Sequence, residues 1–435
     1  MSTRSVGRFA AATFVAAALA VVPAIGAHAD DPPSNWWYDG FGVADVQADG
    51  WTGDGVKVAV IDQQINPDLP VFEGANLTVD DDPLCDGGSV TVNATDEPKP
   101  SNDVVHGSDV TAMLIGNGKG AGKVRGIAPG ADVTFYGYGM TVQQTLTTGC
   151  DTQKRPDGRT ELGEGISRAI DDGAQVISIS LIQSKASAGD IAAVARAVAR
   201  GVVIVAGTPN TTQDADETRP WTYNGVVAVN AFGKDGYLQE DAEVEGQQVS
   251  WPETTVIAPG VNFPSVDWSG NDYWVSGSSL ATPLTAGIIA VTAQKYPAAT
   301  GNQLIQSLIH NTTPDDHELS RSDDTGYGPV SLRHMLKVDP AQYPDENPLM
   351  DKSDYPTPSQ VAKASDTPTP ADSATAVASP QPSATAGAVA GGAGGVWMPV
   401  LIGVGVLVLL AVIALVIVLV VVAGKNKRKN VGGAV

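Results

Sequence analysis

Short apolar runs rich in β-branched residues recur along the middle of the chain and alternate with stretches of helical character. The apolar runs cover residues 56–62, 133–138, 175–181, 202–206, 226–230 and 255–258, and the helical stretches cover residues 106–117, 161–172, 187–200, 280–296 and 301–310. The runs lack strict alternation, as expected for strands buried on both faces. This repetition predicts an α/β domain with a mainly parallel sheet covered by helices. Functional side chains in such folds gather at the carboxyl ends of the strands.

Both ends of the chain carry signals of export and membrane insertion. Residues 1–29 combine two arginines, an apolar run and a terminal AHA sequence, which is typical of a cleaved secretory signal peptide. Residues 400–423 contain no charge, and a helix of that length, rising about 1.5 Å per residue, exceeds the roughly 30 Å hydrocarbon core of a bilayer. The basic residues that follow predict a cytoplasmic C-terminus. We expect a single-pass protein of the cell membrane, with a transmembrane helix over 397–423 and a cytoplasmic tail over 424–435.

Composition divides the exported part of the chain into three segments. Residues 30–52 are too few for an independent fold and hold several aromatic residues, so we expect an N-terminal extension that packs on the next domain. Residues 53–340 contain the strand–helix repetition and form the main extracytoplasmic domain. Residues 341–396 are rich in Pro, Ser, Thr and Ala, and this composition predicts an extended, flexible linker.

Charge and cysteine content exclude two classes of function. The chain has 48 acidic and 26 basic residues, and its net charge of −22 excludes a general nucleic-acid binder. Cys85 and Cys150 are too few for a cysteine zinc site, and in an exported protein we expect one disulfide between them, with two buried thiols as the alternative. Acidic runs at 79–86 and 212–216 lack the spacing of a calcium loop. We therefore expect no metal and no cofactor, with structural calcium as the alternative.

Three polar residues stand where a parallel sheet would bring them together. Asp62 ends the first apolar run, His106 opens a predicted helix beside Gly107, and Ser279 follows Gly277 at the start of another helix. Taken singly, they have ordinary structural interpretations as a turn former, a surface histidine and a helix-capping serine. Together, in the order Asp, His, Ser, they have the logic of an orienting carboxylate, a base and a nucleophile. The first turn of a helix also offers free N–H groups for a developing oxyanion.

The sequence around these residues resembles the subtilisin-like serine proteases, or subtilases. The matching stretches are VAVID, HGSDVTAML and SGSSLATPLTAG, with RGIAPGADV and VIAPGVN as secondary landmarks, and the resemblance runs from about residue 53 to 336. It implies a subtilisin-like three-layer α/β fold, with 53–340 as the catalytic domain. It also implies Ser279 as the nucleophile, His106 as its base and Asp62 as the group that orients the imidazole.

The resemblance extends to the substrate groove, but with departures from the family pattern. The strand that ends in Ser178, Ser180 and Leu181 would pair with an extended substrate, and Ile182, where the family often has glycine, would narrow the groove. The turn after the catalytic aspartate also differs, because two glutamines stand where the family has Ser or Thr and then Gly.

The oxyanion asparagine of the family follows Ala-Gly directly, whereas here Thr208 and Pro209 intervene and Asn210 comes two places late. Three outcomes are open: a shifted loop brings Asn210 into place, Thr208 donates more weakly, or the site is impaired. The loss of one such donor costs roughly 10²–10³ in turnover.

The order of segments is similar to that of the mycosins, membrane-anchored subtilases that accompany type VII secretion. The resemblance implies a membrane-anchored extracytoplasmic serine endopeptidase that acts on protein or peptide substrates, with a type VII-like secretion machinery as partner. The alternative is a catalytically weak or inactive subtilase-fold scaffold that binds or stabilises a membrane secretion complex. An esterase of the α/β-hydrolase class is disfavoured, because Ser279 lacks the second glycine of the G-x-S-x-G turn.

Overall fold

The computed structural model describes residues 35–85, 94–95, 101–139, 141–142, 147–148, 155–183, 187–213, 219–266 and 273–365. The predicted signal peptide, transmembrane helix and cytoplasmic tail lie outside these ranges, together with most of the predicted linker. Within the described ranges, no helix combines the length and the apolar character that a membrane span requires.

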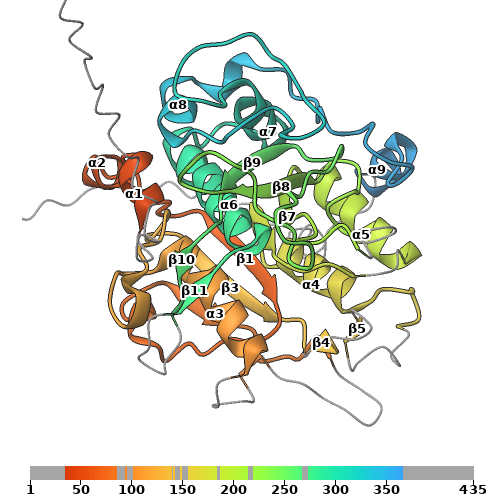
Figure 1. Ribbon diagram of the computed structural model, residues 1–435. Helices are drawn as coiled ribbons and strands as arrows, with labels where there is room; N and C mark the ends of the chain where they lie inside the picture. The colour runs from red at the N-terminus through yellow and green to blue at the C-terminus, as the bar shows by residue number, and fades with distance from the viewer. Residues whose placement is uncertain are drawn as a thin grey trace, which may run out of the picture. The chain divides into compact units, whose positions relative to one another are not determined.

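A seven-stranded sheet forms the centre of the fold (Figure 1), with the strand order β2-β3-β1-β6-β7-β8-β9 and every neighbouring pair parallel. The strands are β1 (Lys57–Asp62), β2 (Leu77–Val79), β3 (Asp132–Gly137), β6 (Val176–Ile179), β7 (Val203–Gly207), β8 (Val227–Phe232) and β9 (Val256–Pro259). Six of them match the predicted apolar runs, and the parallel sheet is confirmed. The sequence does not predict β2, because this short edge strand has no fully buried residue.

The larger helices are α3 (Asn102–Ile115), α4 (Glu161–Asp171), α5 (Ala188–Ala199), α6 (Ser278–Lys295) and α7 (Gly301–His310). The shorter helices are α1 (Trp36–Gly40), α2 (Val43–Ala48), α8 (Leu332–Lys337) and α9 (Pro358–Ser365). The 3₁₀ turns are η1 (Pro70–Phe72), η2 (Ala121–Lys123) and η3 (Pro340–Gln342). Two antiparallel strand pairs complete the elements: β4 (Thr141–Val142) with β5 (Thr147–Thr148), and β10 (Phe263–Pro264) with β11 (Trp274–Val275).

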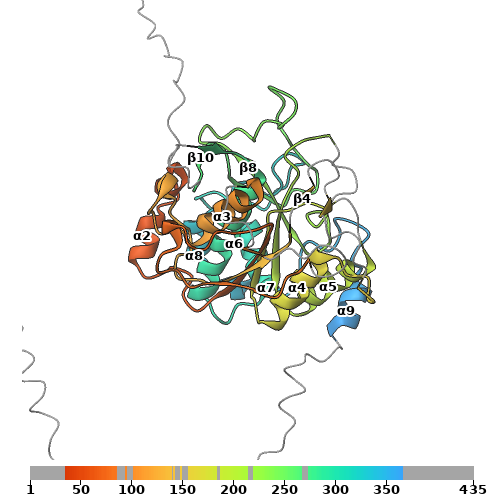
Figure 2. The same ribbon diagram turned by 90° about the horizontal axis from the view of Figure 1, so that it is seen from below.

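Alternate residues of β1 face different helix layers. Val58 and Val60 belong to the apolar cluster that includes residues of α3 and α6, whereas Ala59 and Ile61 belong to the cluster that includes residues of α4 and α5. Figure 2 shows α4 and α5 on one side of the molecule and α3 and α6 on the other. Because both faces of the strand are buried, its sequence is continuously apolar.

Helix α3 begins four residues earlier than the sequence predicts. Ser101 accepts a hydrogen bond from the Val104 N–H at 3.3 Å and caps the helix. His106 therefore lies in the second turn of α3, where the helix holds its backbone on both sides, and the prediction that it opens the helix is wrong. Helix α6 begins at Ser278, so Ser279 is its second residue.

The described part of the N-terminal extension packs into the core of the domain. Trp37 is fully buried, and its ring stacks on Phe263 with the ring centroids 6.3 Å apart. The backbone N–H groups of Thr52 and Gly53 both donate to the side-chain oxygen of Gln294 at 2.8 Å. These contacts tie residues 35–53 to β10 and α6.

The packed chain continues past residue 340, so the predicted boundary between domain and linker is too early. The Asn224 side chain donates to the Ser353 carbonyl at 2.8 Å, the Lys352 ammonium donates to the Val226 carbonyl at 2.7 Å, and α9 packs against α5. Composition does not reveal this docking, because it rests on scattered contacts: Leu349 is buried in the core, and single polar side chains bind backbone groups.

Candidate active site

The carboxyl edge of the sheet brings Asp62 and His106 together. Asp62 ends β1 and is fully buried, and its Oδ1 lies 2.7 Å from His106 Nδ1 and accepts from the Gln63 N–H at 2.8 Å. An ionised carboxylate can only accept hydrogen bonds, so the imidazole hydrogen is on Nδ1. The Nε2 atom of neutral His106 is then free to accept a proton.

The pKa of His106 reflects two opposing effects. Burial lowers the pKa of the imidazole, but the charge of Asp62 and its hydrogen bond, with smaller contributions from Asp109 and Asp103, raise the pKa above its usual value. The side chain is still 32% exposed, so a substrate can reach it. This arrangement favours a base that becomes a stable imidazolium during the reaction.

Gly107 lets α3 approach the loop that follows β1. A Cβ atom there would overlap the Gln64 carbonyl oxygen and would lie 3.0 Å from the Gln64 carbonyl carbon and 3.1 Å from Phe135. The glycine therefore makes room for backbone rather than for the imidazole ring. Gln64 is fully buried, so the two glutamines that follow Asp62 are part of this close packing.

Ser279 faces the same cavity as His106. The cavity measures about 340 Å³, and its lining includes His106, Asn210, Trp274 and Ser279. The Ser279 hydroxyl donates to the Ser180 carbonyl at 3.4 Å, and among the described residues no hydrogen bond joins it to His106. Catalytic hydrogen bonds are often loose in enzymes without substrate and tighten when it binds.

Ser180 supports the first turn of α6 through its side chain. Pro283 lies inside α6 and has no N–H, so the Ser279 carbonyl four residues earlier lacks its helical donor. The Ser180 hydroxyl supplies that donor at 2.8 Å. The side chain of Ser180 thus binds the backbone of Ser279, and the predicted contact of Ser180 with a substrate stays a prediction.

Asn210 reaches the catalytic cavity despite its late position in the chain. Its Oδ1 atom accepts from the Ser278 backbone N–H at 3.0 Å, and its Nδ2 atom would lie 3.0 Å from a Cβ at position 277. Thr208 is 2% exposed and is not part of the cavity lining. Of the two candidate donors, only Asn210 lies at the cavity.

The predicted substrate strand is only partly available. Ser178 is 1% exposed and lies inside the sheet, where it pairs with Val60 of β1 and Val205 of β7. Its prediction as a substrate contact is therefore wrong, because both of its edges are already used. The strand ends at Ile179, and Leu181 follows it at 9% exposure.

The predicted disulfide and acidic loops are only partly described. Cys85 is fully buried and disulfide-bonded, but Cys150 lies outside the described residues, so their pairing stays a prediction. Asp80 and Asp82 form ion pairs with Arg168 at 3.2 and 3.0 Å. In the part of the chain that the structure covers, no group of three or more His, Cys, Asp or Glu residues is arranged to hold a metal.

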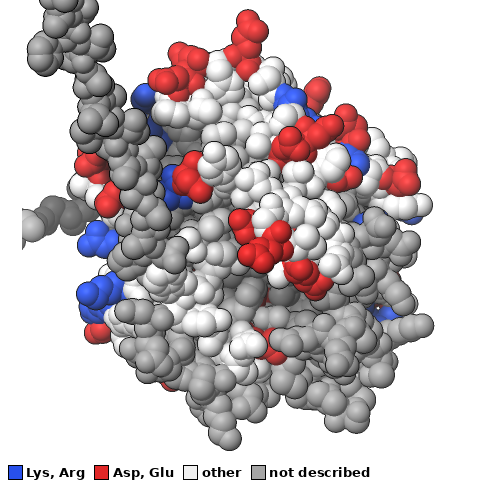
Figure 3. Space-filling model, viewed as in Figure 1, with Lys and Arg blue, Asp and Glu red and all other residues white. Residues whose placement is uncertain are grey.

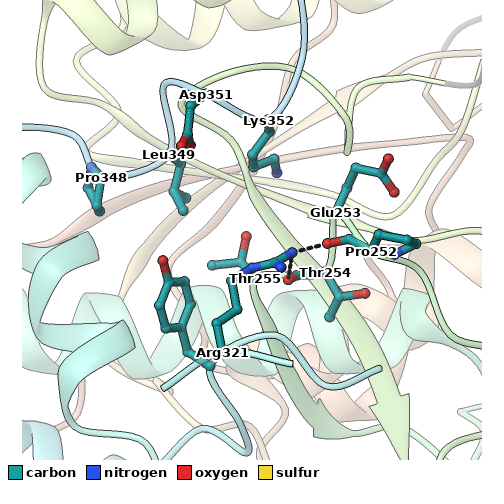
Figure 4. Close-up of a pocket in the computed structure, with 10 residues that line it drawn as sticks. Pro252, Glu253, Thr254, Thr255, Arg321, Pro348, Leu349, Asp351 and Lys352 are labelled. Carbon is teal, nitrogen blue, oxygen red and sulfur yellow. Dashed lines mark hydrogen bonds between the residues drawn. The ribbon is translucent and has the colours of Figure 1, made fainter. Parts of the chain in front are cut away.

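A second cavity of about 340 Å³ lies at the amino end of β9, at the opposite edge of the sheet from Asp62 (Figure 4). The Arg321 guanidinium donates to the Pro252 carbonyl across this cavity, and the Lys352 ammonium donates to the Trp221 and Val226 carbonyls. Burial lowers the pKa of Lys352 to about 7. Both side chains are hydrogen-bonded to backbone carbonyls, and these bonds hold the surrounding loops together.

One face of the described domain carries more acidic than basic side chains. Figure 3 shows several groups of Asp and Glu side chains on the viewed face and fewer Lys and Arg. A nucleic-acid interface needs the opposite sign of charge.

The model of the Subtilase family matches residues 53–328. Among curated relatives, the thermostable alkaline protease of Halalkalibacterium halodurans is 30% identical over 268 residues, which cover 60% of this chain and 63% of the relative. The chain thus matches less than two thirds of the length of that relative.

Solved structures show the same fold. Fervidolysin from Fervidobacterium pennivorans, a keratinolytic enzyme related to subtilisin, is 25% identical with a TM-score of 0.53, and the match covers 70% of this chain and 45% of fervidolysin. MycP1 from the ESX-1 type VII secretion system is 20% identical with a TM-score of 0.54, and the match covers 73% of this chain and 89% of MycP1.

Proposed function

The chain belongs to the subtilase family, and we propose that it is a serine endopeptidase that cleaves peptide bonds through an acyl-enzyme. One observation carries the proposal. His106 Nδ1 is bonded to the buried carboxylate of Asp62 at 2.7 Å, at a cavity that His106 shares with Ser279. A histidine held in one tautomer beside a serine is the arrangement that activates a hydroxyl nucleophile.

In the proposed reaction, Ser279 Oγ attacks the carbonyl carbon of the scissile peptide bond. His106 Nε2 takes the hydroxyl proton and then gives it to the leaving amine. Asp62 keeps the imidazole in the reactive tautomer and stabilises the imidazolium without taking up the proton. In the second half of the reaction, a water molecule takes the place of the serine hydroxyl: it gives a proton to His106 and attacks the acyl carbonyl carbon. His106 then returns the proton to Ser279 Oγ as the acyl group leaves.

The tetrahedral intermediate carries a negative charge on the former carbonyl oxygen, and this oxygen needs hydrogen-bond donors. We propose the side-chain amide of Asn210 and the backbone N–H of Ser279, in the first turn of α6, for this role. What supports the choice is that Asn210 and Ser279 line one cavity. A catalytically weak or inactive scaffold is the less favoured function, because Asn210, the candidate oxyanion donor, lines the cavity.

We further propose that the catalytic domain is extracytoplasmic and anchored in the cell membrane, and that it serves a type VII-like secretion machinery. The apolar segments near both ends and the basic C-terminal tail support the topology. The proposed partner rests on the order of segments along the chain, and the substrates are proteins or peptides. The proposed Cys85–Cys150 disulfide is consistent with export, and non-reducing mass spectrometry of the mature protein tests it.

The decisive experiment compares the full-length wild type with Ser279→Ala in isolated membranes. We expect the wild type to react with a fluorophosphonate probe and to cleave a peptide library, and Ser279→Ala to do neither. Ser320→Ala is the control, because it makes the same change at an exposed serine outside the cavity and should keep both properties. Equal background behaviour of wild type and Ser279→Ala would refute the protease and favour the scaffold.

A further inference from the structure

The side-chain amide of Asn210 is held in a defined orientation. Its Oδ1 atom accepts two hydrogen bonds, from the Ser278 backbone N–H and from Gln239 Nε2, each at 3.0 Å. Because both donors lie on the oxygen side, the Nδ2 group is the part of the amide that remains for the cavity. An amide flipped by 180° would place Nδ2 against two donors and its oxygen toward the reacting carbonyl.

The orientation of Gln239 is in turn set by Asn230, whose own orientation the backbone decides. Asn230 Oδ1 accepts from the Ala231 N–H at 2.8 Å, and Asn230 Nδ2 donates to the Val249 carbonyl at 2.8 Å. A backbone N–H can only donate and a carbonyl can only accept, so this amide has one allowed orientation. Gln239 Nε2 then donates to Asn230 Oδ1 at 3.0 Å, which directs the same NH₂ group toward Asn210.

These two residues are buried and firmly held. Asn230 is fully buried and Gln239 is 4% exposed. The Gln239 backbone is bonded on both sides, since its N–H donates to the Ala231 carbonyl at 3.0 Å and its carbonyl accepts from the Val249 N–H at 3.0 Å. A side chain with so little freedom transmits its orientation to the group it binds.

The same segment also holds the backbone of the loop that carries Asn210. The Ala242 N–H donates to the Asn210 carbonyl at 2.9 Å, and the Trp251 indole donates to the Pro209 carbonyl at 3.1 Å. On the far side of the loop, the Asp241 carboxylate accepts from the Thr212 N–H at 2.7 Å. Residues 239–251 therefore hold the loop through hydrogen bonds at Pro209, Asn210 and Thr212.

We infer that Gln239, oriented by Asn230, is a positioning residue that keeps the Asn210 amide turned with its NH₂ group toward the oxyanion. This inference rests on the proposed function, because it assigns Gln239 a part in the same reaction. Gln239 itself does not touch the substrate and acts only through Asn210.

Gln239→Glu tests the inference with almost no change of shape. A glutamate has no NH₂ group to serve Asn230 Oδ1 and Asn210 Oδ1, both at 3.0 Å from the present Nε2: the ionised form offers only acceptors, and the protonated form offers one hydrogen where the amide offers two. A 180° rotation of the Asn210 amide would relieve the contact between residue 239 and Asn210 Oδ1, but it would point Asn210 Oδ1 toward the oxyanion. We expect kcat to fall by about 10²–10³, as for loss of one oxyanion donor, with KM changed less than about twofold.

The experiment uses the full-length protein and measures kcat and KM on a peptide amide, the Ki of a peptide aldehyde, and the thermal midpoint. An aldehyde forms a tetrahedral adduct on the serine, so its Ki should rise in step with the loss of kcat. Gln239→Met removes the donor without adding charge and should lose about tenfold in kcat, because Ser278 still holds Asn210. Gln248→Glu is the matched control, since Gln248 is exposed on the same segment, and it should behave as wild type.

The double variant Asn210→Ala/Gln239→Met separates positioning from a general structural role. If Gln239 acts through Asn210, the double variant should be no slower than Asn210→Ala alone. Losses that multiply, or Gln239→Glu with kcat within about threefold of wild type, would overturn the inference and leave the protease intact. A wild type no faster than Ser279→Ala would overturn both.

Discussion

Substitution of Gly107 by alanine should damage catalysis without touching a catalytic side chain. A Cβ at this position overlaps the Gln64 carbonyl oxygen and stands 3.0 Å from the Gln64 carbonyl carbon. Comfortable carbon–carbon contacts begin near 3.5–4.0 Å, and the overlap with the oxygen is closer still, so α3 must move away by at least about 0.5–1 Å. The obstacle is backbone, which cannot turn aside as a side chain can.

The same displacement acts on the pair formed by His106 and Asp62. Their 2.7 Å hydrogen bond would lengthen to about 3.2–3.7 Å, at or beyond the limit of a useful bond. Misplacement by about 1 Å costs on the order of 10² in rate. Complete loss of the aspartate's function, at about 10⁴, is the upper bound. We expect kcat/KM on a peptide amide to fall within this range.

Two further measurements separate this explanation from simple unfolding. The pKa of the essential base in the pH–rate profile should decrease, because His106 loses the stabilising carboxylate. Gly165→Ala is the matched control: it adds a methyl group to α4, on the other face of β1, where its nearest neighbours are the ends of the Leu84 and Ile61 side chains at 3.0 and 3.2 Å. Full activity in Gly107→Ala, or an equal loss in Gly165→Ala at equal thermal stability, would refute the reasoning.

Three more outcomes follow from the described contacts. Since the pKa of His106 is raised, the neutral base predominates only at higher pH, and kcat/KM should rise with a midpoint above pH 6.5. Ser180→Ala removes the donor to the Ser279 carbonyl and should lower kcat about tenfold, with Ser180→Thr restoring it, as steady-state kinetics can measure. The pKa of Lys352 falls from 10.5 to about 7 on folding, so the folded state binds fewer protons between these values. The free energy of unfolding in urea should therefore rise from pH 7 to 10.5, and it should not in Lys352→Met.

The core of the fold could be predicted because its signal is local and repeated. Each central strand is a mostly apolar run, as expected for a strand that is buried on both faces. The edge strand β2 and helix α9 have no such signal. Both are held by contacts with distant parts of the chain, since β2 pairs with β3 and α9 packs against α5.

The side chains proposed for catalysis could be located for a related reason. Asp62, His106 and Ser279 each lie in a short motif beside the element that positions them, and parallel strands bring such motifs to one edge. The substrate contact predicted at Ser178 fails, because both edges of this residue pair with neighbouring strands, which are not visible in the motif. The bond from the Ser180 hydroxyl to the Ser279 carbonyl is equally hidden, because it depends on Pro283, which leaves that carbonyl without a helical donor.

The two-residue delay of Asn210 shows how a motif can be misjudged when it is read alone. Compared with the family pattern, the Thr208-Pro209 insertion suggests a weakened site, because it moves the donor along the chain. The position of the donor, however, is decided by Gln239 and by the backbone around residues 242–251, and by Ser278 from the side of the nucleophile. Because Asn210 is fixed by Gln239 on one side and by Ser278 on the other, the loop before it can be two residues longer without moving its side chain. Lengthening a loop by two residues costs little free energy. The residues that hold this loop lie 29 to 68 positions away in the chain, so only the folded structure connects them with the departure from the family pattern.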